Sequence, residues 1–232
     1  MKLMLKYCAC AVAMTVGISA SANAQANCRL GDEIIVTGMS GQSPAPAETL
    51  STPGSNFHAL KRIANFERWN NACRTTAVFG RMPNADGATE EMTRELDECD
   101  GSSRDEIEVG FDERMEGGFI TEIQVTTSGQ SNPLQRRIKG VEIRTAVVTE
   151  ACNLVRFEWT PRLADVCARN GIDYEEGAPS PLISSDERNN TDAVGNWQRC
   201  PQGYVGTGLV IQRGWGGVSA LGLECREVIV RE

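Results

Sequence analysis

The amino-acid sequence predicts a mainly β protein with helical insertions, an α+β class, in which disulfides staple the strands together. Between residues 105 and 159, apolar residues alternate with polar ones in several runs, which is the period of strands with one buried face. Between residues 55 and 100, apolar residues recur every three or four positions, which is the period of amphipathic helices. Cys200 and Cys225 bracket a hairpin-like unit near the end of the chain. An antiparallel sandwich is one architecture that would bury such strands.

The first 24 residues have the layout of a cleavable secretory signal. Lys2 and Lys6 precede an apolar stretch over residues 8–20, and the small-residue sequence 22–24 stands ahead of Gln25. The apolar stretch is too short to cross a bilayer, which needs about 20 such residues. We therefore expect residues 25–232 to form a single exported domain without a transmembrane segment. Because the signal is of Gram-negative type, the predicted location is periplasmic or secreted.

The charge of the chain argues against several classes of partner. The formal net charge is −8, and it becomes −10 once the two lysines of the signal are removed. No dense Lys/Arg patch occurs, whereas binding to a phosphate backbone requires clustered basic residues. Nucleic acid and anionic membranes are therefore not expected partners.

Seven cysteines remain after the signal, and in an exported protein they indicate disulfides. None stands in a Cys-x-x-Cys pair and His58 is the only histidine, so the sequence predicts no metal site and no cofactor. The preferred pair is Cys200 with Cys225, which would contribute about 3 kcal/mol. Cys73 with Cys99 is the second choice, at the ends of two successive predicted helices. The remaining connectivity, and the cysteine left over from the odd count, stay open.

The first hundred residues are predicted to hold one strand, one loop and two helices. The β-branched run 32–38 indicates a strand, and the Pro/Ser/Gly-rich stretch 40–56 indicates a loop. A helix is predicted from 55 to 73, because apolar residues recur every three positions from Phe57 to Trp69. A second helix is predicted from 88 to 99.

The remainder is predicted to be β, with one further helix. Residues 105–159 form the first β part, and residues 160–171 form a helix that begins after Thr160 with Pro161 at its first position. Residues 177–196, rich in Pro, Ser, Asp and Asn, indicate a loop or linker. Residues 197–232 form the C-terminal hairpin unit.

An internal repeat connects the two β parts. Residues 118–125 with 138–144 can be laid over residues 203–211 with 218–224, with one residue gapped in the first strand. Each copy has a glycine, an aromatic residue, an alternating strand, a turn and a second alternating strand. Chance similarity between two amphipathic hairpins is the alternative explanation.

The C-terminal copy, with Trp197 ahead of Cys200-Pro201-x-Gly203 and with Ala220-Leu221-Gly222-Leu223-x-Cys225, resembles the repeat of vitelline membrane outer layer proteins and of jacalin-type lectins. The resemblance implies a β-prism of three four-stranded sheets and carbohydrate binding. A third copy is not visible in the sequence, and the chain lacks a clear Gly-x-x-x-Asp sugar loop of the jacalin kind. Separately, residues 32–38 resemble the TonB box of outer-membrane receptors, which implies a role as an accessory partner of such a receptor.

No sequence motif for nucleophilic or metal-assisted catalysis occurs. Paired carboxylates leave a secreted hydrolase as an alternative function. These pairs lie at Asp97-Glu98 with Asp100, at Asp112-Glu113 and at Glu175-Glu176. Because charge runs of this kind usually lie on a solvated face, catalysis by these carboxylates is not the favoured hypothesis.

Three aromatic residues are candidate ligand-binding residues. Trp215 stands in a Gly-Trp-Gly-Gly turn, where an indole can either face solvent or fold back over its own hairpin. Tyr204 and Trp197 are the lesser candidates. The favoured function is that of an exported non-enzymatic binding or structural protein, with a glycan or another component of the cell envelope as partner.

Overall fold

The computed structural model describes residues 28–41, 45–67, 74–83, 90–97, 106–110, 118–128, 132, 136, 138–149, 151–156, 193–214 and 217–230. All regular elements in these ranges are strands, and no helix there is long and apolar enough to cross a membrane. The strands are β1 (Cys28–Val36), β2 (Ser40–Gly41), β3 (Ala47–Ser51), β4 (His58–Glu67), β5 (Arg74–Arg81), β6 (Glu91–Asp97), β7 (Glu106–Gly110), β8 (Gly118–Thr127), β9 (Ile138–Val148), β10 (Leu154–Arg156), β11 (Ala193–Val194), β12 (Gln198–Arg199), β13 (Tyr204–Gly214) and β14 (Gly217–Val230).

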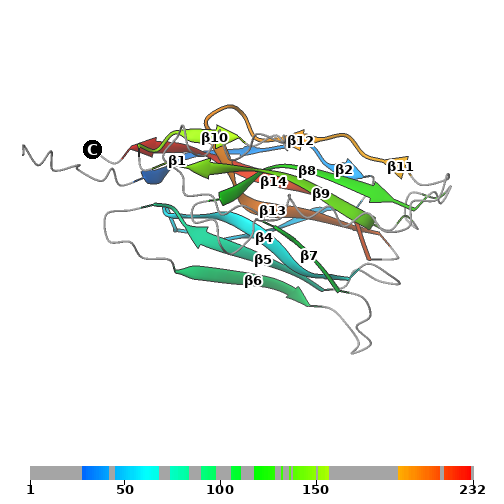
Figure 1. The fold of residues 1–232 in the computed structure, drawn as a ribbon. Coiled ribbons are helices and arrows are strands. Elements are labelled where there is room, and N and C mark those ends of the chain that lie inside the picture. The colour runs from blue at the N-terminus through cyan, green and yellow to red at the C-terminus, as the bar shows by residue number, and fades with distance from the viewer. Residues whose placement is uncertain are drawn as a thin grey trace, which may run out of the picture.

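The strands form three antiparallel sheets (Figure 1). Sheet A has the order β1-β14-β13-β3, with β2 also paired to β14. Sheet B has the order β6-β5-β4-β7, and sheet C has the order β10-β9-β8-β11, with β12 also paired to β8. Each sheet contacts the other two. The arrangement is therefore that of a β-prism, with three sheets around one core, and not that of a two-sheet sandwich.

The three sheets share one topology. In sheets B and C, a central hairpin is flanked by the next strand of the chain on one side and by a returning strand on the other, which is a Greek key. Sheet A has the same spatial arrangement, but its third and fourth places are filled by β1 with β2 and by β3. Sheet A is therefore the same four-strand unit, except that the chain does not run directly from β14 to β1. The pairing of β1 with β14 completes the sheet (Figure 1).

A β-bulge occurs at the same place in the first strand of each central hairpin. The extra residue is Lys61 in β4, Thr121 in β8 and Thr207 in β13. Each of the two threonine hydroxyls donates a hydrogen bond of 3.3 Å to a carbonyl oxygen on the second strand of its hairpin. The predicted repeat between the second and third hairpins is therefore structural. The bulges align residue 120 with residue 206, so no gap is needed.

Apolar side chains from all three sheets fill the interior. The main cluster of buried residues comprises Leu60, Ile63, Ala77, Phe79, Ile120, Ile123, Val125, Ile138, Val141, Ile143, Cys200, Leu209, Ile211, Val218, Leu221, Leu223 and Cys225. A second cluster gathers around Cys28 and Cys152 and includes Leu30, Phe119 and Val205. Since no sheet can bury its apolar face alone, the three must fold together.

Two disulfides join sheet A to sheet C. Cys200 is bonded to Cys225, as predicted, with 5.6 Å between their Cα atoms. Cys28 is bonded to Cys152, with 5.3 Å between their Cα atoms, a pair that the sequence analysis left open. Cys152 adopts a φ of 59° in the turn between β9 and β10. The predicted pair Cys73–Cys99 lies outside the described residues.

The predicted helix over 55–73 is wrong where the structure describes it, because residues 58–67 form β4. The bulge explains the error. A regular strand places residues three apart on opposite faces, but one extra residue restores them to the same face. Leu60 and Ile63 are both fully buried across this bulge. A three-residue apolar spacing can therefore mark a bulged strand as well as a helix.

The predicted helix over 88–99 is also wrong over residues 91–97, which form β6. Met92 and Leu96 both pack against the core. Their spacing of four residues is a multiple of two, so it places them on one face of a strand as well as on one face of a helix.

The other predicted elements have mixed outcomes. Strand 32–38 is confirmed in part by β1, and residues 204–230 form the predicted C-terminal hairpin. The predicted loop 40–56 contains the short strands β2 and β3. The predicted helix 160–171 lies outside the described residues, as does most of the linker 177–196.

Gly206 lies where the three sheets meet, and it should not tolerate a larger residue. A Cβ atom at this position would lie 2.8 Å from the Ile120 carbonyl oxygen of sheet C and 3.7 Å from Leu60 of sheet B. We expect Gly206→Ala to lower the free energy of unfolding by about 1–3 kcal/mol, measured by urea denaturation. Gly31→Ala is the control, because its Cβ would make an ordinary 3.5 Å contact. Equal effects of the two substitutions would contradict the steric argument.

Candidate functional site

The structure places the predicted ligand-binding residues apart. Tyr204 begins β13, and Gly214 ends it at the turn that contains Trp215. Eleven residues of strand span about 33 Å, so Tyr204 and the turn cannot form one small site. Trp215 itself lies outside the described residues. Trp197 immediately precedes β12 on sheet C.

Tyr204 is half-buried and its hydroxyl is engaged. The hydroxyl donates a hydrogen bond to Glu33 Oε2 at 3.2 Å, and the ring packs against the main core. Desolvation raises the pKa of the Tyr204 hydroxyl, and the charges of Glu33 and Glu227 raise it further. Tyr204 therefore remains a neutral phenol that fastens β13 to β1.

Trp197 is partly exposed and makes a cation–π contact. The guanidinium carbon of Arg144, on β9, lies 4.5 Å from the centre of the Trp197 ring. A contact of this kind contributes about 0.5–1 kcal/mol at an exposed position. The contact fixes the indole on the outer side of sheet C.

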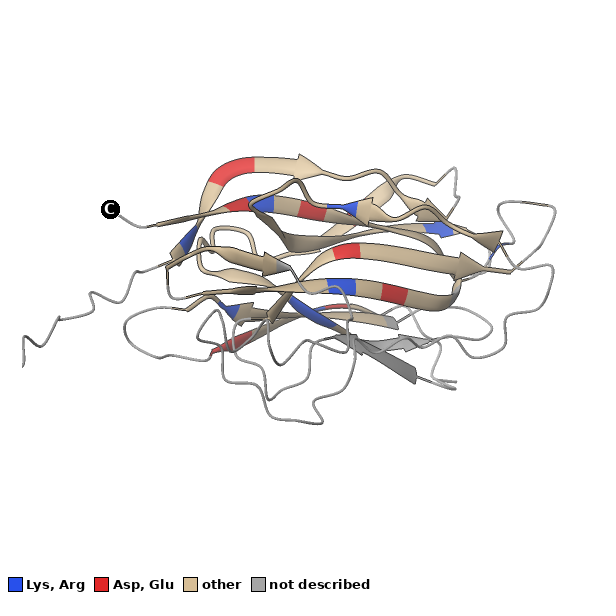
Figure 2. Cartoon of the chain, turned by 45° about the horizontal axis from the view of Figure 1, so that its top comes forward, with Lys and Arg blue, Asp and Glu red and all other residues tan. Residues whose placement is uncertain are grey.

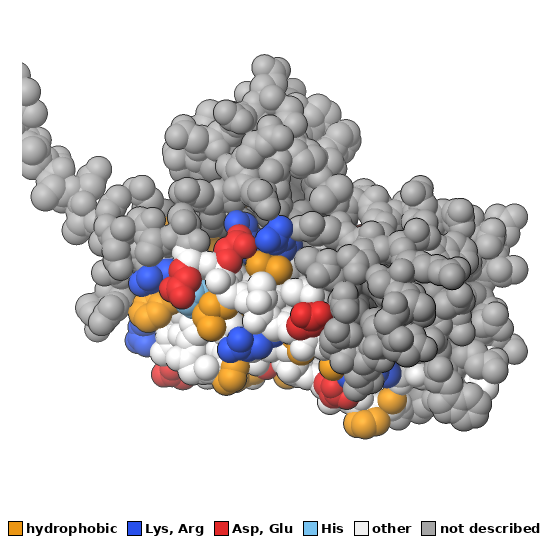
Figure 3. Space-filling view, turned by 90° about the horizontal axis from the view of Figure 1, so that it is seen from below, with side chains coloured by type: hydrophobic (Ala, Val, Ile, Leu, Met, Phe, Trp, Pro, Cys, Tyr) orange, Lys and Arg blue, Asp and Glu red, His pale blue; other side chains and the backbone are white. Residues whose placement is uncertain are grey.

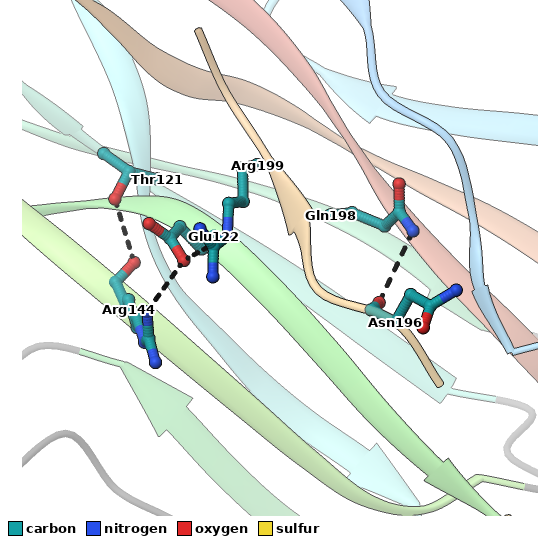
Figure 4. Close-up of polar contacts among 6 residues, drawn as sticks. All are labelled: Thr121, Glu122, Arg144, Asn196, Gln198 and Arg199. Atoms are coloured by element: carbon teal, nitrogen blue, oxygen red, sulfur yellow. Dashed lines mark hydrogen bonds and ion pairs between the residues drawn. The ribbon is translucent and has the colours of Figure 1, made fainter. Parts of the chain in front are cut away.

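Glu122 connects Arg144 to a second arginine. Arg144 Nη1 lies 3.3 Å from Glu122 Oε2, and Arg199 Nε lies 3.1 Å from the same oxygen (Figure 4). The three residues come from adjacent strands, since Glu122 on β8 is paired with Arg144 on β9 and with Arg199 on β12. The Glu122 side chain is only 7% exposed. We call Glu122, Arg144, Trp197 and Arg199 the Trp197 cluster.

Side-chain amides hold the segment that carries the cluster. Gln124 Nε2 donates to the Gly195 carbonyl oxygen at 2.7 Å. Gln198 Nε2 donates to the carbonyl oxygen of Asn196 at 3.4 Å (Figure 4). It also donates to the Met39 carbonyl oxygen at 3.3 Å. Because Met39 belongs to the segment between β1 and β2, these bonds fix Trp197 against both sheet A and sheet C.

Elsewhere, charges of both signs are interspersed along the strands (Figure 2). Seen from the side of sheet B, hydrophobic side chains are scattered among charged ones in the coloured part of the surface (Figure 3). Lys61 and Arg62 both pair with Glu91 there, at 2.8 and 3.3 Å. These contacts are typical of a solvated sheet face.

No group of three or more His, Cys, Asp or Glu side chains that could hold a metal ion occurs in the described part of the chain. The carboxylate pairs that would serve a hydrolase, at 97–100, 112–113 and 175–176, have no described side chains. The alternative function of a hydrolase stays a prediction.

His58 is buried at the start of β4 and contacts Ser55. The Ser55 hydroxyl lies 2.6 Å from His58 Nδ1, and the same hydroxyl oxygen accepts a hydrogen bond from the Phe57 backbone N–H at 3.3 Å. His58 Nε2 has no hydrogen-bond partner among the described residues. Burial lowers the pKa of His58 and the nearby Arg81 lowers it further, while Glu90 opposes both. The pair closes a local turn.

The sequence alone did not indicate the ion pairs of the Trp197 cluster. Glu122 and Arg144 lie within the predicted repeat, but pairing their strands in register required knowledge of the bulge at Thr121. Arg199 adjoins the predicted linker and is brought to Glu122 only by β12. Only Trp197 was named from the sequence, as a tryptophan ahead of Cys200-Pro201 and as a lesser aromatic candidate.

Comparisons with known proteins find similar solved structures. The chain is 14% identical to the agglutinin of Calystegia sepium, over 84% of this chain and 97% of that one, with a TM-score of 0.42. It is also 14% identical to the Calsepa lectin in complex with a biantennary N-glycan, with the same coverage and a TM-score of 0.45. Single-chain recombinant jacalin is 10% identical, over 84% of this chain and 95% of that one, with a TM-score of 0.40. No family profile and no curated protein matches the sequence.

These neighbours are jacalin-like lectins of the β-prism fold. The three-sheet topology of this chain stands on its strand pairing alone. The resemblance to vitelline membrane outer layer proteins stays a prediction.

The stability of the protein should depend on the charge of His58. Because burial lowers its pKa in the folded state below the usual 6.5, the unfolded chain binds the proton more tightly. Stability is then fully present above pH 6.5 and is lost as the pH falls below it. We expect the free energy of unfolding to decrease between pH 7.5 and 5.5, and His58→Gln to flatten this slope. An NMR titration of this single histidine showing a pKa at or above 6.5 would contradict the prediction.

Proposed function

We propose that the protein is an exported, non-enzymatic binding protein that recognises carbohydrate at the Trp197 cluster. The observation that carries the proposal is a partly exposed indole held among charged side chains on adjacent strands. An aromatic ring beside planar hydrogen-bonding groups suits a sugar, which has apolar C–H faces and a rim of hydroxyls.

The rigidity of the cluster supports this proposal. Glu122 and Arg144 project from long central strands of sheet C, and Gln124 and Gln198 fasten the segment that bears Trp197. Binding groups that are already ordered lose little conformational entropy when a ligand arrives. Sugars bind weakly per contact, so such pre-ordering favours their recognition.

Two further features support export. Disulfides persist in oxidising compartments, and the chain has two among its described cysteines. The signal-like segment at residues 1–24 agrees with a periplasmic or secreted location.

The other aromatic candidates are less well supported. The Tyr204 hydroxyl is already bound to Glu33, so a ligand would have to displace that bond. Trp215 remains a prediction from sequence, at the far end of β13 from Tyr204.

A second candidate function is partner binding through β1. Ile34 and Val36 are 55% and 57% exposed, and they lie two residues apart on the same face of the strand. Only β14 pairs with β1 among the described strands. An outer strand with exposed aliphatic residues can accept a strand from another protein. This observation favours the hypothesis of an accessory partner of an outer-membrane receptor.

The carbohydrate proposal predicts that Trp197→Ala reduces binding to a glycan array at least tenfold, because stacking on the ring is lost. Circular dichroism would confirm that the variant is folded. Trp215→Ala is the matched control, since it removes the other tryptophan that the sequence offers as a candidate. The proposal fails if Trp197→Ala binds as the wild type does, and binding lost only in Trp215→Ala would move the site to that turn.

The partner hypothesis predicts that Ile34→Lys with Val36→Lys abolishes co-sedimentation of the purified protein with isolated Gram-negative outer membranes. Charged residues on an outer strand disfavour strand addition. Val194→Lys is the control, because Val194 is 51% exposed on β11 of another sheet. Unchanged co-sedimentation of the double variant, or no co-sedimentation of the wild type, would overturn the hypothesis.

A further inference from the structure

We infer that the Trp197 cluster selects sugars that carry a carboxylate, such as uronic acids and sialic acids. The inference rests on the proposed function and adds a class of ligand to it. It depends on which donor groups of the two arginines are already used, and on the net charge of the cluster.

Arg199 keeps most of its donors available. Its Nε binds Glu122, and its two terminal amino groups make no hydrogen bond or ion pair with the rest of the described chain. Its side chain is 54% exposed. A guanidinium has five N–H donors in a planar fork, and carboxylates match that fork with two parallel hydrogen bonds. Arg199 therefore presents an exposed guanidinium that Glu122 holds in place at its Nε atom.

Arg144 provides a second positive charge beside the indole. One of its terminal nitrogens binds Glu122, its guanidinium covers the Trp197 ring, and its side chain is 35% exposed. Arg144 and Arg199 carry two positive charges and Glu122 carries one negative charge. The three side chains together therefore have a net charge of one positive unit. That surplus matches a ligand with one negative charge.

Glu122 is the positioning residue of this arrangement. Its side chain is almost fully buried, and both arginines converge on its Oε2 atom (Figure 4). Arginine side chains lose about 2 kcal/mol of rotamer freedom when they are ordered. Because Glu122 orders both before a ligand arrives, the ligand does not bear all of that cost.

The surrounding charge limits the ligand to few negative groups. The whole chain carries a net charge of −8, which repels polyanions at long range. Glu142 lies two residues before Arg144 on β9, so it is on the same face of the strand. A single carboxylate on a largely neutral sugar fits this setting better than a sulfated or phosphorylated polymer.

The test compares matched ligands by NMR titration of the folded protein. The probes are methyl glucuronide, methyl galacturonide and sialyllactose, with methyl glucoside, methyl galactoside and lactose as their neutral counterparts. Acetate serves as the bare carboxylate, and glucose 6-sulfate as the other anion. We expect the carboxylated sugars to bind at least tenfold more tightly than their neutral counterparts, and acetate to bind weakly, because it offers nothing to the indole.

Variants assign the preference to the arginine fork. Arg199→Gln should weaken the binding of carboxylated sugars at least tenfold more than that of neutral sugars and so remove the preference, while Arg199→Lys should retain part of it. Arg94→Gln, at an exposed arginine of β6, should have no effect. Glu142→Gln should strengthen binding of the carboxylated sugars, because it removes a nearby negative charge.

The outcomes separate this inference from the proposed function. Equal binding of acidic and neutral sugars, or a preference that survives in Arg199→Gln, would overturn the inference and leave carbohydrate binding intact. Tighter binding of glucose 6-sulfate than of methyl glucuronide would replace the carboxylate with a sulfate as the recognised group. If no sugar of either kind binds, both the proposed function and the inference fail.

Discussion

The narrow interior where three sheets converge is the constraint on which the rest of the structure depends. Leu60, Ile120 and Gly206 hold the same place in the three central hairpins, immediately before the bulge. Gly206 lies close to both Leu60 and Ile120. A Cβ atom added to it would lie nearest to the Ile120 carbonyl oxygen. Two large residues fill the space, so the third must be a glycine. The bulges then turn the following residues, Ile63, Ile123 and Leu209, back into the core.

This packing requires that β1 stay paired with β14 in sheet A. Sheet A is assembled from both ends of the described chain, so its closure depends on the pairing of β1 with β14 and on cross-links to sheet C. The loop-entropy relation gives a contribution of about 3.5 kcal/mol for the Cys200–Cys225 bond and about 4.9 kcal/mol for the Cys28–Cys152 bond, whose sequence separations are 25 and 124 residues. Both bonds act at the junction of sheets A and C. Trp197 lies three residues before Cys200, so the same junction fixes the candidate site.

The sequence predicted those parts of the fold whose periodicity is unambiguous. The C-terminal hairpin and its disulfide follow from a long alternating pattern between two cysteines, and both are confirmed. The helices over 55–73 and 88–99 were wrong where described, because a bulge disguises a strand at Leu60–Ile63 and because a spacing of four fits either structure at Met92–Leu96. These errors hid the hairpin formed by β4 and β5, and with it the threefold repeat. The candidate site was predictable only at Trp197, since its ion pairs require strands that are distant in sequence to lie in register.

The threefold repeat also shows that the Trp197 cluster is confined to one sheet. The bulges and strand pairings give each charged residue of the cluster an equivalent in the other two sheets. In place of Glu122, Arg144 and Arg199, sheet A has Gly208, Glu224 and Ser51, and sheet B has Arg62, Val78 and Gly110. Neither set can form a carboxylate held between two guanidiniums. Residues that serve packing alone are similar in all three sheets, such as Ile63, Ile123 and Leu209 in the core. Only on sheet C do these positions hold a carboxylate and two guanidiniums, which strand pairing aligns beside an indole. This confinement to one sheet would give the proposed ligand one binding place per chain.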